Sequence, residues 1–254
     1  MKKRGKVYFI GGGPGDPELI TLKALKIIEK ADVIIYAGSL VNEKLLEFSK
    51  NSNVKIYNSA NMSLEEIFEI VKKFINEGKI IARIHTGDPS IYGAIYEQMV
   101  LLEKENIEYE IIPGVSSAFA SAAKLKTEFT VPEISQTVIF SRIEGKTPVP
   151  EKEKLSEIAK LNATLVLFLS VSLIEKVKKE LLKGYSKDTP VIIAKRVTWE
   201  DEEFIYTTVE EMDKVVKEKN IKKTALILVG KVFEKDLKLK IFKRSILYSN
   251  DKSC

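Results

Sequence analysis

In the stretch Val7-Tyr8-Phe9-Ile10-Gly11-Gly12-Gly13-Pro14-Gly15-Asp16, a short apolar run ends in a loop of glycine and proline. The arrangement returns in Ile80-Ile81-Ala82-Arg83-Ile84, which is followed by His85-Thr86-Gly87-Asp88-Pro89-Ser90-Ile91-Tyr92-Gly93. Short apolar runs that stop at such residues are typical of buried strands. In open α/β sheets, ligands bind in loops at the carboxyl ends of the strands. We therefore predict a small-molecule pocket formed by these loops at one edge of a sheet.

Apolar strand-like runs alternate with amphipathic helix-like segments through the first half of the chain. The predicted strands are residues 7–10, 33–37, 80–84 and 109–112. The predicted helices are residues 17–30, 64–76, 92–104 and 117–124. Repeated strand-helix units indicate a mainly parallel sheet that is covered by helices.

A second set of strands and helices follows a segment of little periodicity at residues 127–135. The predicted strands are residues 137–141, 164–169, 190–197 and 224–229, with residues 204–208 as an antiparallel partner of the strand before it. The predicted helices are residues 151–160, 173–183 and 209–219. We predict two α/β domains, residues 1–126 and 127–254, with mainly parallel or mixed sheets flanked by helices.

Composition excludes several classes of protein. The chain has 254 residues, 44% of them hydrophobic, and no apolar run approaches the ~18 residues of a membrane span. We expect a cytoplasmic protein without a membrane partner. One cysteine, Cys254, and one histidine, His85, argue against an internal disulfide or a protein-bound metal. The net charge of +5 fits a solvated surface or attraction of an acidic ligand, and without a basic stripe among aromatics we expect no nucleic-acid partner.

The first loop resembles a dinucleotide fingerprint but departs from it. Asp16 stands where the third glycine of G-x-G-x-x-G is needed, and a carboxylate there would repel phosphate. Asp16 followed by Pro17 fits the beginning of a helix. The loop therefore either binds a ligand without phosphate or is a purely structural turn.

The other two loops have the same ambiguity. Gly87 gives the backbone freedom, and Asp88-Pro89 fits a turn before a helix. His85 is either a buried structural residue or a catalytic one. The hydroxyls of Pro113-Gly114-Val115-Ser116-Ser117 would cap the next helix, or bind a carboxylate or a ribose.

These loop sequences together resemble the tetrapyrrole methylases, the S-adenosylmethionine-dependent enzymes of cobalamin and sirohaem synthesis. The resemblance covers nearly the whole chain, and its marks are residues 7–21, 86–93 and 113–117. Within that family the chain is most similar to the branch that methylates C11 of precorrin-4 or cobalt-precorrin-4. The segments that point to this branch are residues 83–89, 97–99, 136–139 and above all Glu144-Gly145-Lys146-Thr147-Pro148-Val149-Pro150.

The resemblance implies a cofactor site in a cleft and a homodimer. Pro14 would line the methyl-transfer site, and Leu169 and Val197 would lie near the ribose and adenine of S-adenosylmethionine. The methionine part of the cofactor would be held by Thr86, Gly87, Asp88 and Ile91. The adjoining wall of the site would be formed by Ser116 and Ser117. Asp16 and Asp88 are candidates for a base, although each would equally serve as a helix cap.

The expected substrate carries many carboxylates, for which arginine and lysine are the natural partners. The candidates are Arg83, Arg142, Lys146, Lys195 and Arg196, of which we expect one or two to bind substrate. The alternatives within the family are methylation at C20 or C17, methylation of uroporphyrinogen and methylation of a diphthamide side chain. A non-catalytic cofactor-binding module is the alternative outside it.

Overall fold

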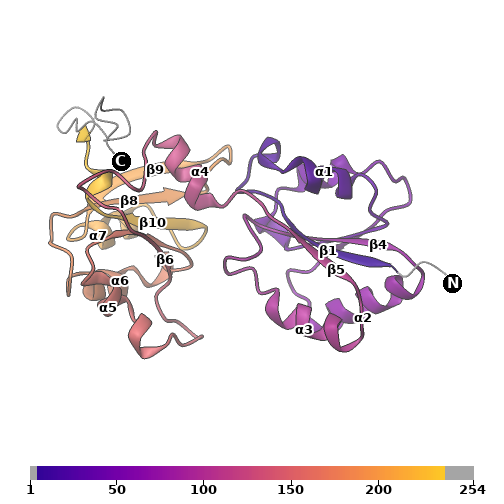
Figure 1. Ribbon diagram of the computed structural model, residues 1–254. Coiled ribbons are helices and arrows are strands. Elements are labelled where there is room, and N and C mark those ends of the chain that lie inside the picture. The colour runs from indigo at the N-terminus through magenta and orange to yellow at the C-terminus, as the bar shows by residue number, and fades with distance from the viewer. Residues whose placement is uncertain (1–4, 238–254) are drawn as a thin grey trace, which may run out of the picture. The chain divides into compact units, whose positions relative to one another are not determined.

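The computed structural model describes residues 5–237 and divides into two compact units (Figure 1). Within the described residues, the first unit runs to Ala120 and also includes Thr198–Glu200. The second unit comprises Ser121–Val197 and the residues from Asp201 onward. The division falls within α4 (Ser117–Lys124), whereas the sequence analysis places the boundary after residue 126. Cys254 lies outside the described residues.

The first unit is built on a five-stranded sheet in which every pairing is parallel. Its strands are β1 (Lys6–Gly11), β2 (Val33–Tyr36), β3 (Lys55–Asn58), β4 (Ile80–His85) and β5 (Tyr109–Ile112), in the order β3-β2-β4-β1-β5. Separate buried clusters of apolar side chains lie on its two faces, so the sheet is covered on both sides, as parallel sheets require.

The connections of this sheet leave its central strands on opposite faces. Helix α1 (Leu22–Ile28) joins β1 to β2 on one face, and α3 (Tyr96–Lys104) joins β4 to β5 on the other, beside α2 (Leu64–Asn76) (Figure 1). Because β1 and β4 are neighbours, the chain turns away in opposite directions at their carboxyl ends. Such a topological switch point opens a crevice in which α/β proteins bind their ligands.

Local signals determine some of these elements completely. Helix α2 has the predicted bounds because Ser63 and Glu66 form a capping box and Ile67, Val71 and Phe74 make one buried face. The predicted helix 17–30 is wrong in part, since it is divided into a 3-10 turn (Pro17–Leu19) and α1.

The other errors have similar local causes. The helix predicted at 92–104 begins only at Tyr96, because Tyr92 and Ala94 adopt left-handed backbone angles. Strand β3 was not predicted, since it is a short edge strand whose side chains are mostly exposed.

The second unit contains a mixed five-stranded sheet in the order β6-β7-β10-β8-β9. Its strands are β6 (Val138–Ser141), β7 (Thr164–Leu167), β8 (Pro190–Lys195), β9 (Glu203–Thr208) and β10 (Ala225–Val229). The predicted antiparallel pair β8–β9 is confirmed. The helices that contribute to its buried core are α5 (Leu155–Ala159), α6 (Ile174–Leu181) and α7 (Met212–Glu218). The predicted fold class, two α/β units with parallel and mixed sheets, is therefore confirmed.

Candidate active site

Two glycine loops meet directly at the switch point of the first unit. Gly13 and Gly87 form an isolated antiparallel bridge, in which the Gly87 amide donates to the Gly13 carbonyl at 2.7 Å and the Gly13 amide donates back at 3.3 Å. The Gly12 amide donates to the His85 carbonyl at 2.8 Å. The loops after β1 and β4 therefore form one connected surface.

The loop after β5 joins the same surface by close backbone contact. A Cβ atom on Gly114 would lie 2.2 Å from the Gly87 carbonyl oxygen, and one on Gly11 would lie 2.5 Å from the Gly114 Cα. No side chain fits at either place, because real Cβ atoms do not approach backbone so closely. At Gly11 and Gly114, glycine is therefore needed because the loops approach each other closely.

Asp88 holds the junction together. One of its carboxylate oxygens accepts the Gly114 amide at 2.9 Å, and the other accepts the Ser90 amide at 2.8 Å. Burial raises the pKa of Asp88, but the hydrogen bonds from Ser90 and Gly114 outweigh it, so the pKa is below its usual value. Asp88 therefore stays ionised at neutral pH and fixes the loop, but it is not the helix cap considered for it, because the next helix, α3, begins only at Tyr96.

Asp16 has a similar local role. Its side chain accepts the Glu18 amide at 2.9 Å and caps the turn Pro17–Leu19. The hydroxyl of Ser116 likewise accepts the Ala118 amide, at 3.3 Å, at the beginning of α4. The base role considered for Asp16 or Asp88 stays a prediction.

The junction suits a cation better than a phosphate. Phosphate-binding loops present unpaired backbone amides to the ligand. Here the glycine amides that donate within the protein are those of Gly12, Gly13, Gly87 and Gly114. The carboxylates of Asp16 and Asp88 add negative charge to the same loops. A positively charged or zwitterionic ligand therefore fits this chemistry.

Gly87 leaves open space at the junction. Its φ is +61°, and an added Cβ would meet only the Ser116 Cα, at 3.8 Å. Thr86 is exposed beside it, and Ile91 is half-buried further along the same loop. Pro14 is buried on the facing loop. The expected cofactor residues of the first unit thus come from loops that follow the adjacent strands β4, β1 and β5.

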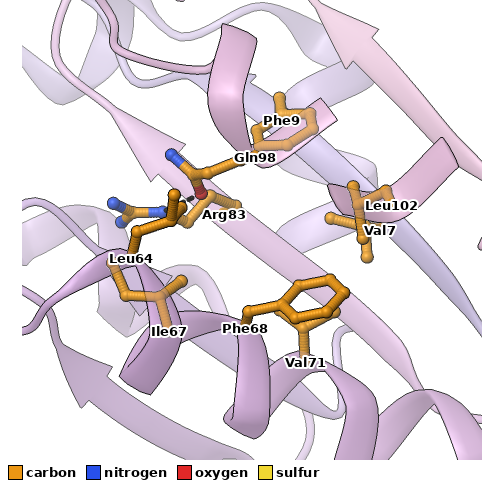
Figure 2. A pocket seen from close by; sticks show the side chains of 9 residues that line it. All are labelled: Val7, Phe9, Leu64, Ile67, Phe68, Val71, Arg83, Gln98 and Leu102. Atoms are coloured by element: carbon orange, nitrogen blue, oxygen red, sulfur yellow. Dashed lines mark hydrogen bonds between the residues drawn. The ribbon is translucent and has the colours of Figure 1, made fainter. Parts of the chain in front are cut away.

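Arg83 lies apart from these loops. Its side chain is on the face of the sheet that α2 and α3 cover, beside a small cavity lined by apolar residues and Gln98 (Figure 2). Arg83 is only 6% exposed, and its guanidinium donates to the Gln98 side chain at 3.3 Å and to the Ile35 carbonyl at 3.4 Å. Burial lowers its pKa to about 10. We do not retain Arg83 as a contact for substrate carboxylates, because this burial separates it from the loop surface.

Gln98 connects Arg83 to the end of the second loop. Its amide nitrogen donates to the Ala94 carbonyl at 2.9 Å. Ala94 has a φ of 50°, a strained angle for a residue with a side chain. The hydrogen-bonded side chains of Arg83 and Gln98 therefore support the strained backbone that leads from the second loop into α3.

His85 is buried near the junction and has no charged role there. Its ring packs against Phe9 at 5.9 Å, and its Nε2 has no hydrogen-bond partner among the described residues. Burial and, to a lesser extent, the nearby charge of Arg83 lower the pKa of His85 to about 3, against the opposing effect of a hydrogen bond to the Gly93 carbonyl. The structural interpretation considered for this residue therefore fits its neutral, buried state.

This shift makes the stability of the protein sensitive to acid. Below about pH 6.5 the unfolded chain binds a proton at His85, while the folded chain does not until pH falls to about 3. The free energy of unfolding should therefore fall by about 1.4 kcal/mol per pH unit in this window from His85 alone. Urea unfolding near pH 7 and pH 5 measures the slope.

His85 is the only histidine, so its substitution isolates the effect. In His85→Gln we expect the free energy of unfolding to depend less steeply on pH, by the contribution of about one bound proton. Equal slopes in the two proteins would refute the lowered pKa.

The remaining expected residues belong to the second unit. Strands β6, β7 and β8 run in the same direction, so their carboxyl ends lie at one edge of that sheet. Residues that follow these ends are Arg142, Lys146, Leu169, Arg196 and Val197, and Lys195 is the last residue of β8. Leu169 is 70% exposed with a φ of 52°, a backbone angle that is costly for leucine. Val197 is buried.

The basic residues at this edge differ in their surroundings. The Arg142 guanidinium donates to the carbonyls of Thr147 and Pro148, each at 3.2 Å, and so folds the segment that distinguishes the expected branch. Arg196 pairs with the exposed Asp201. Lys146 is exposed and Lys195 is half-buried.

Comparisons with known proteins identify the family of this chain. A family model described as Tetrapyrrole (Corrin/Porphyrin) Methylases matches residues 6–213. A cobalt-precorrin-4 C(11)-methyltransferase of Methanocaldococcus jannaschii is 58% identical over 91% of this chain and 90% of its own length. One from Priestia megaterium is 46% identical over 96% of both chains.

Solved structures give the same assignment. A cobalt precorrin-4 methyltransferase, described as a cobalamin biosynthetic enzyme, superposes with a TM-score of 0.87 at 48% identity over 91% of this chain and 96% of its own. A uroporphyrin-III C-methyltransferase of Thermus thermophilus, complexed with S-adenyl homocysteine, has a TM-score of 0.76 at 27% identity over 91% and 96%. This chain belongs to the tetrapyrrole methylase family and is a methyltransferase, as its loop motifs predict.

The sequence analysis missed the residues that contact the first loop from distant positions in the sequence. These are Asn42, Thr198 and Trp199, whose side chains all bind backbone groups of residues 14–16. No periodicity or motif marks them, although Trp199 is the only tryptophan of the chain.

Proposed function

We propose that this protein transfers a methyl group from S-adenosylmethionine to C11 of cobalt-precorrin-4, giving cobalt-precorrin-5 in corrin synthesis. The observation that carries the proposal is the junction of the loops after β1, β4 and β5. Open space lies there beside Gly87, and the glycine amides already donate hydrogen bonds within the protein. The names of the similar proteins, identical at 46–58% of positions, support the choice of substrate.

The same comparisons favour the cobalt complex over the metal-free ring. The two relatives named for the cobalt substrate are 58% and 46% identical, and a precorrin-4 C(11)-methyltransferase of Pseudomonas aeruginosa is 45% identical. The metal would enter as part of the substrate. Among the described residues, no group of three or more metal-binding side chains stands close enough to hold an ion.

The residues at the junction fit S-adenosylmethionine as a methyl donor. The cofactor carries a sulfonium and an ammonium but no phosphate, which matches loops whose glycine amides already donate within the protein and which hold the ionised carboxylate of Asp88. When bound, it supplies an electrophilic methyl group for in-line attack by C11, and S-adenosylhomocysteine leaves. Thr86, Gly87 and Asp88 would hold its methionine part, and Pro14 would line the side where the methyl group faces the substrate.

The protein would act mainly by orientation. In-line transfer requires the nucleophilic carbon, the methyl group and the sulfur to be aligned. Holding them in this alignment removes a large entropic part of the activation barrier. The buried backbone of residues 11–15 would keep water away from one side of this alignment. In this proposal the substrate carboxylates bind among Arg142, Lys146, Lys195 and Arg196, of which one or two would be essential.

Arg142 offers a test of substrate recognition. Arg142→Ala should raise the KM for the tetrapyrrole about tenfold, since it removes the charge and releases the carbonyls of Thr147 and Pro148. The Kd for S-adenosylmethionine should change by less than about twofold. Steady-state kinetics and calorimetry measure the two.

Arg142→Lys separates the two contributions of the arginine. Lysine keeps the charge but cannot bridge two carbonyls as the guanidinium does. Recovery of the KM by lysine would assign the effect to charge, and failure to recover would assign it to the loop. Unchanged KM in Arg142→Ala would remove this residue from the site.

The direct test of function is incubation of the purified protein with labelled S-adenosylmethionine and precorrin-4, with and without cobalt. Mass spectrometry counts the added methyl groups, and carbon NMR locates them. One methyl at C11, formed faster with cobalt, is the expected result. Methylation of uroporphyrinogen instead would contradict the proposal and favour the activity named for a 36% identical relative.

Two further properties complete the proposal, a homodimer from the resemblance to the family and a cytoplasmic location from the composition. We propose a homodimer, which light scattering on the purified protein would detect as twice the mass of 28.7 kDa. We also propose a cytoplasmic location. None of the described helices is long and apolar enough to cross a membrane.

A further inference from the structure

Three side chains from distant parts of the sequence bind the backbone of the first loop. The Trp199 indole donates to the Pro14 carbonyl, the Asn42 amide donates to the Gly15 carbonyl, and the Asp16 amide donates to the Thr198 hydroxyl, each at 2.9 Å. Thr198–Glu200 belong to the first unit, so all these contacts lie within it. The loop is thus fixed at three consecutive residues.

The Trp199 ring also occupies the place of a side chain on Gly15. A Cβ atom there would lie 2.4 Å from Cδ1 and 2.5 Å from Nε1 of the indole. Glycine at this position therefore allows the ring edge to reach the peptide between Pro14 and Gly15. The indole therefore both packs closely against Gly15 and donates a hydrogen bond to the Pro14 carbonyl.

We propose that Trp199 is a positioning residue for methyl transfer, because it selects one orientation of the Pro14–Gly15 peptide. The inference rests on the proposed function, which places Pro14 at the methyl-transfer site. Proline has no amide donor, so its carbonyl is the group by which a neighbour can hold it. Glycine on the other side leaves that peptide conformationally permissive, and the indole restrains it.

The neighbouring ion pair does not account for this restraint. Glu200 lies next to Trp199 and meets Lys44 at 3.5 Å, but both side chains are well exposed. Exposed pairs of this kind contribute little to stability. Lys44→Ala and Glu200→Ala are therefore matched controls that alter the same segment without touching the peptide.

Trp199 is the only tryptophan, so its fluorescence reports on this loop alone. The wild-type protein is titrated with S-adenosylhomocysteine, with excitation at the red edge of indole absorption where adenine does not absorb. We expect a saturable change in emission whose midpoint equals the Kd from calorimetry. Unchanged emission at concentrations that calorimetry shows to be saturating would overturn the proposal.

Substitutions then test the positioning role. Trp199→Phe keeps an aromatic ring but loses the donor, and we expect kcat to fall about fivefold, the worth of one neutral hydrogen bond. The Kd for S-adenosylmethionine should stay within about twofold. Gly15→Ala, which displaces the ring, should lower kcat in the same way, while both control variants keep the wild-type kcat.

A purely structural role would give a different result. Trp199→Phe with lowered thermal stability but unchanged kcat would refute the proposal. The methyl acceptor in these assays is whichever tetrapyrrole the direct test identifies, so a wrong substrate does not affect the outcome. If calorimetry finds no binding of S-adenosylhomocysteine at all, the proposed function fails, and this inference fails with it.

Discussion

Gly87→Val is expected to weaken binding of S-adenosylmethionine by at least about a hundredfold. The valine side chain would extend into the open space at the loop junction, where the added Cβ meets only the Ser116 Cα at 3.8 Å. A branched residue at a φ of +61° also carries strain of about 1–3 kcal/mol, which the folded chain must absorb. Calorimetry gives the Kd, and urea unfolding gives the stability.

Gly78→Val is the matched control for the strain. Gly78 has a φ of +79° and follows α2, where it is exposed. It should lose similar stability and keep the wild-type Kd. Wild-type affinity in Gly87→Val would mean that the cofactor does not occupy the space beside Gly87, and the site would have to be placed elsewhere.

The second large effect is expected at Gly114. In Gly114→Ala the added Cβ would lie 2.2 Å from the Gly87 carbonyl oxygen and 2.7 Å from the Gly11 Cα, so two loops must separate. Because backbone on both sides resists movement, we expect a loss of about 3 kcal/mol in the free energy of unfolding. Binding of S-adenosylmethionine should also be lost, since the Asp88 bond to the Gly114 amide would break.

Gly184→Ala separates these two consequences. Its added Cβ would lie 2.2 Å from the Ala159 carbonyl, a clash of the same severity within the second unit. We expect a similar loss of stability with normal affinity for S-adenosylmethionine at a temperature where the variant is folded. Near wild-type stability and affinity in Gly114→Ala would show that the three loops do not depend on their close contact.

Much of the fold was predictable from the sequence, because its causes are local. The apolar runs of β1 and β4 and the capped, amphipathic α2 have no competing local signal, and their bounds were predicted closely. The errors at two helices fall where one residue changes the local backbone, whereas β3 was missed because it is an exposed edge strand. Thr21 begins a new helix with its own cap, and Ala94 delays α3 with a left-handed φ.

The loop motifs also determined the family by themselves. A carboxylate at Asp16 in place of the third glycine excluded a dinucleotide site before any geometry was known, and the structure shows that carboxylate as a cap. The predicted location of the pocket follows from a general property of parallel sheets, since loops after adjacent strands must share an edge.

Tertiary structure decided which residues touch one another. Nothing local indicates that Gly11 and Gly114 exclude side chains because of each other, or that Arg83 lies in the core with Gln98. The bond between Asp16 and Thr198 joins residues 182 positions apart. Propensities and caps act over one or two turns of chain, whereas such contacts depend on strand order and packing, which no local pattern specifies.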